Sequence, residues 1–130
     1  MYVPPALSSN HEKFAKMSEI ILEVEVRMKF RMTTATEDDD CLISIAGSLD
    51  SGTCPAAEQR INDAISRQGS ALRNIILDFK NLLYISSLGL RILFKLAKLH
   101  PNKVKIINVP ADIMDVFKMT GIDKTMTVID

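Results

Sequence analysis

Apolar and polar residues alternate strictly between Leu22 and Met32. Apolar side chains occupy the even positions and Glu, Arg or Lys the odd ones, which predicts a long, half-buried β-strand. Its charged outer face favours an edge position in a sheet, because charge on an edge discourages pairing with other chains. We expect a polar turn at Glu37–Asp40 and a second strand, antiparallel to the first, at Cys41–Gly47.

The pattern then changes to the spacing of an amphipathic helix. The loop Gly47–Thr53 precedes it, Ser51 or Thr53 is suited to cap the helix, and Pro55 fits its first turn. Gly69 is expected to end it. The residues that form its apolar stripe are Ala57, Ile61, Ala64 and Ile65.

Strands and helices continue to alternate in the second half of the chain. In chain order we expect strand Asn74–Phe79, helix Leu88–His100, strand Lys103–Val109, a helix from Pro110 to Thr120–Gly121, and a short strand or extended tail at Thr125–Ile129. The apolar run from Ile75 is typical of a strand buried on both faces. Ile113, Val116 and Phe117 are expected to point inward from the last helix.

This order predicts an α/β fold with a mixed, mostly parallel sheet of four to five strands, an antiparallel N-terminal edge strand and three to four helices. The length of 130 residues suits one domain, which we assign to residues 19–130, with residues 1–18 as a flexible extension. In such sheets, ligands and partners meet the carboxyl ends of the strands. The loops Asp50–Thr53 and Ser86–Gly89 are both expected there.

Charge and composition narrow the function. Sixteen basic and sixteen acidic residues cancel, so nothing favours nucleic acid or an anionic membrane as a partner. The chain contains no run of about 18 apolar residues and no evident secretory signal, so we expect a cytoplasmic protein. Cys41 and Cys54 fit no zinc spacing and are expected to be reduced thiols. The acidic run Glu37–Asp40 lacks the glycine of a calcium loop, and we interpret it as a solvated turn.

Two hydroxyls, Ser86 and Ser87, stand where a buried strand passes into a helix. A serine at such a junction is also the geometry of a hydrolase nucleophile, but the Gly-x-Ser-x-Gly motif is absent. His100 lies 13 residues along the same helix, roughly 20 Å away, and cannot act as the base. The glycine-rich phosphate-binding loops are absent, and Asp50 and Asp78 are far apart in sequence. We therefore expect no enzyme, no metal and no cofactor.

Two interpretations of Ser87 remain open from the residues alone. A helix N-cap would account for a serine at this position. A phosphorylation switch would use the same position, because the helix dipole tolerates a phosphate that adds nearly two negative charges. Leu88 beside it is apolar at an expected exposed position, which favours a protein-docking surface.

Three stretches resemble one known family in order and spacing. They are Gly47-Ser-Leu-Asp50, Asp78-Phe-Lys-Asn-Leu-Leu-Tyr-Ile-Ser-Ser-Leu-Gly-Leu90, and Ile106-Ile-Asn-Val-Pro110 through Met119-Thr-Gly-Ile122. Together they are similar to the STAS domain (sulfate transporter and anti-sigma factor antagonist) across about residues 20 to 129. The resemblance implies an anti-sigma factor antagonist. Such a protein binds an anti-sigma factor that is also a serine kinase, is released when that kinase phosphorylates it, and is reset by a PP2C-type phosphatase.

The family's Asp-Ser-Ser-Gly-Leu motif, aligned on Gly89-Leu90, puts the phosphorylated serine on Ser87. The acid before it falls on Ser86, which leaves Ser86 as the alternative acceptor, and the serine after it falls on Leu88. The partner surface that the resemblance implies comprises Asp50, Ser51, Thr53, Ser86, Ser87, Leu88, Gly89, Leu90 and Arg91. Two other functions remain open, an adaptor subunit of a transport or signalling complex and a nucleotide or small-molecule sensor.

Overall fold

Strands and helices alternate along residues 30–129, which are the residues that the computed structural model describes. The elements are β1 Phe30–Glu37, β2 Asp40–Leu49, α2 Cys54–Gln68, a 3₁₀ turn at Gly69–Ala71, β3 Asn74–Asp78, β4 Leu82–Ile85, α3 Ser87–Leu99, β5 Val104–Ile107, α4 Ala111–Thr120, α5 Ile122–Thr125 and β6 Thr127–Ile129. The predicted α/β class is confirmed. No helix in this range has the length and apolar content that a membrane crossing requires.

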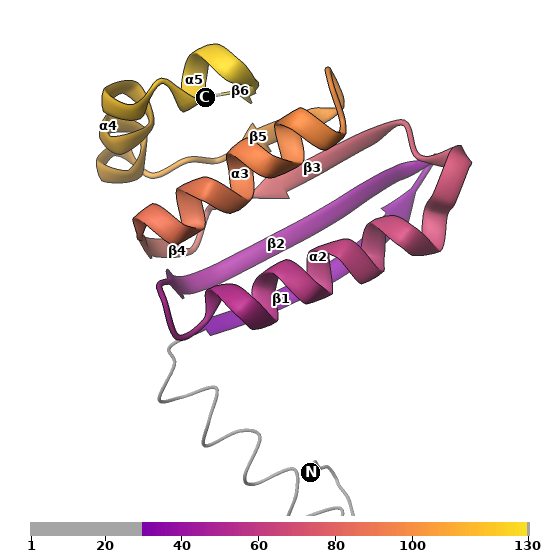
Figure 1. The fold of residues 1–130 in the computed structure, drawn as a ribbon, viewed down its shortest axis with the longest axis horizontal. Helices are drawn as coiled ribbons and strands as arrows, with labels where there is room; N and C mark the ends of the chain where they lie inside the picture. Colours follow the sequence, from indigo (N-terminus) through magenta and orange to yellow (C-terminus); the bar gives the residue numbers. More distant parts are fainter. Residues whose placement is uncertain (1–29, 130) are drawn as a thin grey trace, which may run out of the picture. The chain divides into compact units, whose positions relative to one another are not determined.

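The strands within residues 30–129 form one six-stranded sheet in the order β1-β2-β3-β5-β6, and β4 also pairs with β2. β2 is parallel to both β3 and β4, β3 is parallel to β5, and β5 is parallel to β6. β1 and β2 form an antiparallel hairpin at the edge. Figure 1 shows α2 and α3 side by side on one face of this sheet, with their amino ends at the same end of it.

The first strand ends later than expected. Positions 22–29 of the expected strand, and the extension at residues 1–18, lie outside the described residues. The described strand does not end at Met32 but continues to Glu37, because Thr33–Thr36 are mostly β-branched and extend the pairing. The turn shrinks to Asp38 and Asp39, whose φ angles of 51° and 70° match a two-residue hairpin turn. The predicted edge position is confirmed.

Two short strands share the same side of β2. Ser44 on β2 pairs with Asp78 on β3, and further along, Leu49 pairs with Ile85 on β4. Five steps along β2 therefore correspond to seven along β3 and β4. One additional residue lies in the connection between β3 and β4, and the other is Leu83 within β4, at the register shift opposite Gly47 and Ser48. The sequence analysis did not predict β4. It brings the chain back to the carboxyl end of β2, directly before the two serines.

The helix-facing side of the sheet forms the core. The predicted stripe of α2 is buried, and so are Ile113 and Phe117, while Val116 is half-buried. The rings of Phe79 and Phe117 lie 6.2 Å apart and connect β3 to α4. On the opposite face Ile76 is only half-buried, so the expectation that this strand is buried on both faces is wrong.

The C-terminal segment contains one element more than expected. Gly121, with φ of 84°, ends α4 as predicted, and the chain then makes the single turn α5. Ile122 at the start of α5 is fully buried. The expected short strand follows as β6 at the other edge of the sheet.

Candidate functional site

The two loops that the sequence analysis selected meet at the carboxyl ends of the parallel strands. The backbone N–H of Ser86 donates to the carbonyl oxygen of Leu49 over 2.8 Å. This bond joins the end of β4 to the end of β2, and so it joins the starts of α3 and α2 (Figure 1). The fold therefore brings together residues that are more than thirty positions apart in sequence.

The loop from Asp50 to Thr53 is held by its own polar groups. Asp50 Oδ1 accepts from the N–H groups of Gly52 and Thr53 over 2.9 and 3.1 Å. The Thr53 hydroxyl donates to Ser48 O over 2.7 Å and accepts from Asp50 N–H over 2.9 Å. Thr53 precedes α2 as expected, but its side chain does not cap the helix and is fully buried. Asp50 and Thr53 therefore shape the loop, and Ser51 is its exposed predicted residue.

The helix cap of α3 is Ser86 and not Ser87. Ser86 has extended backbone angles, and its Oγ accepts from the N–H of Gly89 over 3.3 Å. This is the bond that an N-cap serine makes to the third residue of a helix. Ser87 is the first residue of α3, and its side chain is exposed. The N-cap interpretation of Ser87 is therefore wrong by one position.

Ser86 also contacts the thiol at the start of α2. Burial raises the pKa of the Cys54 thiol, a hydrogen bond with the Ser86 hydroxyl acts in the opposite direction, and the charges of Asp50 and Glu58 raise the pKa further. The thiol is thus neutral at physiological pH, and both predicted reduced cysteines, Cys41 and Cys54, are free and buried. The half-buried Ser86 therefore has two neighbours at its hydroxyl, the Gly89 N–H and this sulfur.

Gly89 allows α3 to approach the end of β2. A Cβ at this position would lie 2.7 Å from Ile85 Cγ1 and 3.2 Å from both Cβ and O of Leu49. Gly89 is buried and Leu90 is half-buried, so these two predicted surface residues act mainly in packing. The close packing of Gly89 holds the first turn of α3 against Ile85 and Leu49.

The exposed part of the site is apolar and basic. Beside Ser87, Leu88 is 38% exposed, as expected, and Arg91 is exposed one turn further along α3. Two residues that the sequence analysis missed are more accessible still, Leu83 at 71% and Tyr84 at 52%. These two residues became recognisable only from the structure, because only the first and last residues of β4 are buried and the two between them are exposed.

A shallow groove of about 230 Å³ runs between α2 and α3 beside Leu88 and Arg91. The ion pair between Lys95 Nζ and Glu58 Oε2, 2.6 Å long, spans the two helices in this groove. We define the docking surface as the exposed residues at and before the start of α3. Its members are Leu83, Tyr84, Ser87, Leu88 and Arg91.

The carboxylates considered in the sequence analysis have structural partners. Asp78 Oδ1 accepts from the backbone N–H of Lys80 and from Asn108 Nδ2. Among residues 30–129, no group of three His, Cys, Asp or Glu side chains is arranged to hold a metal ion. His100 caps the carboxyl end of α3, at the far end of the helix from Ser87. Its separation from the serines is as expected.

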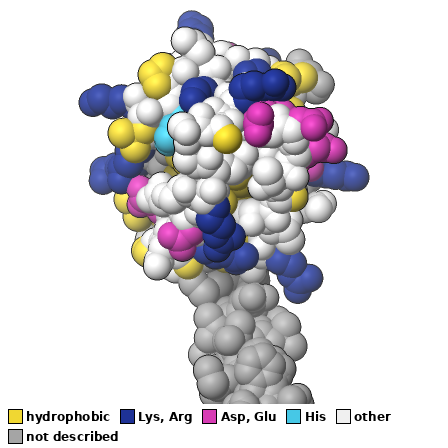
Figure 2. Space-filling view, turned by 90° about the vertical axis from the view of Figure 1, so that its right-hand side faces the viewer, with side chains coloured by type: hydrophobic (Ala, Val, Ile, Leu, Met, Phe, Trp, Pro, Cys, Tyr) yellow, Lys and Arg dark blue, Asp and Glu magenta, His cyan; other side chains and the backbone are white. Residues whose placement is uncertain are grey.

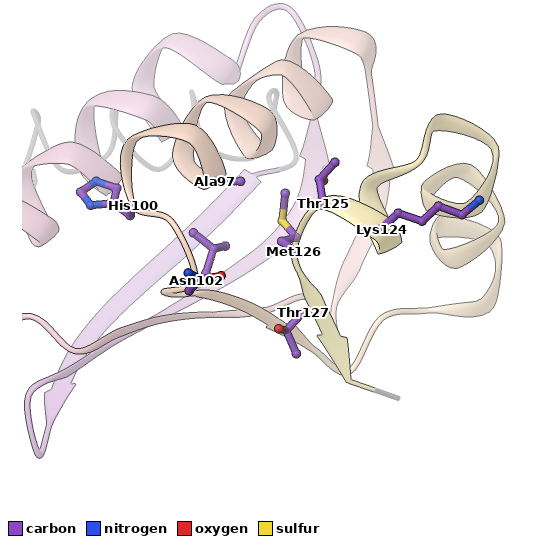
Figure 3. A pocket seen from close by; sticks show the side chains of 8 residues that line it. Ala97, His100, Asn102, Lys124, Thr125, Met126 and Thr127 are labelled. Carbon is purple, nitrogen blue, oxygen red and sulfur yellow. The ribbon is translucent and has the colours of Figure 1, made fainter.

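A second depression lies at this far end. It has a volume of about 280 Å³ and is lined partly by His100, Asn102, Lys124 and Met126. Figure 3 shows that Lys124 extends away from the other three side chains, so they do not converge on one ligand position. Acidic and basic side chains are interspersed over this end of the molecule (Figure 2). We therefore assign no function to this depression.

Solved structures share this fold at low sequence identity. An anti-sigma factor antagonist from Mycobacterium paratuberculosis superposes with a TM-score of 0.68 at 21% identity, over 76% of this chain and 84% of that chain. The Bacillus cell fate determinant SpoIIAA in its phosphorylated form gives 0.52 at 22% identity, over 78% and 91%. A chain of the Acinetobacter MlaFEDB complex gives 0.59 at 17% identity, over 75% and 100%.

These likenesses establish the fold, and the sequence establishes the family. A comparison with curated proteins finds no match. The family model for the STAS domain matches residues 31–130, which is most of the chain and includes both loops of the site. This chain therefore belongs to the STAS domain family.

Proposed function

We propose that the protein is a cytoplasmic anti-sigma factor antagonist that acts by binding alone. In this proposal the docking surface binds an anti-sigma factor that is also a serine kinase, and this binding releases a sigma factor for transcription. Phosphorylation of Ser87 breaks the complex, and a PP2C-type phosphatase restores it. The protein itself needs no cofactor, nucleic acid or membrane contact for this cycle.

The observation that supports the proposal most is the contrast between the two serines. The Ser86 hydroxyl is bonded to Gly89 N–H and contacts Cys54, so a phosphate there would break the cap. Ser87 is exposed at the first position of α3. In the proposed reaction the Ser87 oxygen forms a bond to the γ-phosphorus of ATP, ADP leaves, and the hydroxyl proton passes to a base on the kinase.

A phosphate on Ser87 would act at the surface and not through unfolding. The amino end of α3 carries unpaired N–H groups and the positive end of the helix dipole, which stabilise an anion. The added charge of nearly −2 would stand beside Leu88 in the docking surface and would oppose burial of its apolar groups against a partner.

The direct experiment mixes the protein with its cognate serine-kinase anti-sigma factor and ATP, and maps the phosphate by mass spectrometry. We expect one phosphate on Ser87, none in Ser87→Ala, and unchanged modification of Ser87 in Ser86→Ala. Modification of Ser86 alone would transfer the switch to the cap residue, and modification at neither serine would contradict the proposal.

Binding is tested with a mimic of the phosphate. Ser87→Asp should weaken the complex with the kinase at least tenfold, because it places a charge in the docking surface, while the melting temperature stays close to that of the wild type. Ser87→Asn is the matched uncharged control and should retain binding. A large loss of stability in Ser87→Asp would instead favour a purely structural role for this residue.

The apolar members of the docking surface are tested in the same assay. Leu83→Ser removes the most exposed apolar side chain of the docking surface and should weaken the complex several-fold, roughly the effect of one interface contact worth about 1 kcal/mol. Leu99→Ser is the matched control. Leu99 is 63% exposed, which is similar to Leu83, but it lies at the other end of α3. Equal effects of the two variants would exclude the proposed surface.

A second candidate function is that of an adaptor subunit, and two observations favour it. Ser86 stands where the family's motif has an acid, and the fold is also that of a chain in the MlaFEDB complex. The protein could thus serve as an adaptor subunit of a transport or signalling complex. Neighbouring genes for a kinase and a sigma factor would favour the antagonist, and a transporter ATPase would favour the adaptor. A thermal-shift screen with GTP and ATP tests the third alternative, a nucleotide sensor.

A further inference from the structure

The outer edge of β1 lacks the features that usually block strand pairing. β1 is the first strand of the sheet order, so one of its edges faces away from β2 within residues 31–129. From Met32 to Thr36 it contains neither a charged residue nor a proline. Thr33 to Thr36 are all exposed. Protein edges are normally protected by lysine, proline or a bulge, and an uncharged β-branched edge is a template for another strand.

The backbone orientation of this edge follows from one hydrogen bond. Arg60 Nη2 on α2 donates to the carbonyl oxygen of Met32 over 2.8 Å, so this carbonyl points away from β2. In an antiparallel pair, residues alternate between facing the partner strand and facing away from it. Thr34 and Thr36 therefore share the orientation of Met32, and their N–H and C=O groups are directed outward.

We propose that β1 pairs with β1 of a second copy of this chain. The two strands run antiparallel and are related by a two-fold axis that passes between the two Thr34 residues. In this register Thr34 pairs with Thr34 of the second copy, and Met32 pairs with Thr36. These are the residues whose backbone groups face outward, so all of them enter hydrogen-bonded pairs. The Met32 carbonyl oxygen, which already accepts from Arg60 Nη2, accepts the second bond through its other lone pair. The sheet then continues from one protomer into the other.

The charges of β1 are complementary in this register and in no adjacent one. Arg31 falls directly opposite Glu37 of the second copy, and the two-fold axis generates the same pair a second time. Both residues are exposed and lie on the sheet face opposite to the buried Met32. They occupy non-hydrogen-bonded pairs, in which side chains approach more closely.

Space is available on the other face of the strand. A depression of about 260 Å³ lies beside Thr34 and Thr36 and extends to Ala64 and Arg67 of α2. The side chains of the second β1 that point toward the helices would enter this space. Because a seven-residue edge buries less than a standard interface, we expect a weak, reversible dimer.

The test is a charge-swap cycle on the full chain, measured by sedimentation equilibrium from about 10 μM to about 1 mM at low salt. The wild type should approach twice the monomer mass at the upper concentrations. Arg31→Glu and Glu37→Arg each place like charges opposite one another twice and should weaken dimerisation about five- to tenfold. The double variant restores two opposite-charge pairs and should dimerise like the wild type.

A backbone variant makes the test independent of charge. Thr34→Pro removes the central outward N–H and should abolish the dimer while the melting temperature of the monomer changes little, because proline is tolerated on a free edge. Thr33→Pro removes an N–H that faces β2 and should lower the melting temperature instead. A monomer at all concentrations would overturn the proposal. A dimer that is insensitive to Thr34→Pro, or a double variant as weak as the single ones, would also overturn it.

Discussion

Ser86 and Ser87 are neighbours with the same side chain, yet their surroundings give them different roles. The Ser86 hydroxyl satisfies the N–H of Gly89 and contacts Cys54, whereas Ser87 is exposed. A helix cap adjusts the stability of the fold, and an exposed hydroxyl at the helix start does not. The two roles can therefore be separated by single substitutions.

We predict that Ser86→Ala lowers the free energy of unfolding by about 1 kcal/mol, because the cap to Gly89 is lost. Ser87→Ala should change it by less than about 0.5 kcal/mol, as expected of an exposed position without such a bond. Urea titrations of the two variants and the wild type measure both values. Equal losses would show that the cap is shared between the two serines.

The sequence shows that a serine lies at this junction, but it does not show which of the two is the cap. Both residues are good caps by type, and the choice depends on where β4 ends. Because Ser86 N–H is bonded to Leu49 O, the strand fixes Ser86 just outside the helix. The roles of Asp50 and Thr53 within their loop are likewise set by contacts that the sequence pattern does not encode.

At the scale of elements, the helices were easier to predict than the strands. The stripe of α2 from Ala57 to Ile65 repeats with a period that only a helix satisfies. β4 has four residues and follows β3 after only three residues, none of them glycine or proline, so the sequence analysis missed the second strand. β1 continues beyond its expected end at Met32, because its threonines favour extended backbone and pair with β2 up to the turn.

The contact between α3 and β2 leads to a second prediction. Gly89→Ala should lower the free energy of unfolding by about 1–3 kcal/mol, because its Cβ would overlap Ile85 Cγ1, although alanine favours helices over glycine by about 1 kcal/mol. Gly52→Ala is the control, since its Cβ would make only an ordinary 3.4 Å contact with Asp50. Thermal or urea unfolding compares them, and a stable Gly89→Ala would mean that α3 can shift outward.

At the scale of the whole molecule, charge gives a simple signature of the proposed switch. The 16 basic and 16 acidic residues leave a formal net charge of zero at pH 7. A phosphate adds about −1.5 to −2, so one modification gives the neutral protein a net negative charge.

We predict that the phosphorylated form migrates toward the anode in a native gel at pH 7 and elutes later from an anion exchanger, while the unmodified form is nearly immobile. Ser87→Ala treated with the kinase should remain nearly immobile, which identifies the residue. A shift of the same size in Ser87→Ala would place the phosphate elsewhere.

The bond from Ser86 N–H to Leu49 O has a further consequence for the timing of such a switch. Ser87 directly follows the residue that is bonded to the end of β2, and it is the first residue of α3 and not part of a hinged loop. Adding or removing a phosphate there requires no slow rearrangement of the domain, which would take microseconds to milliseconds or longer. The delay between a signal and its response would then contain no contribution from a conformational change of this protein. The turnover rates of the kinase and the phosphatase would determine how fast the switch responds.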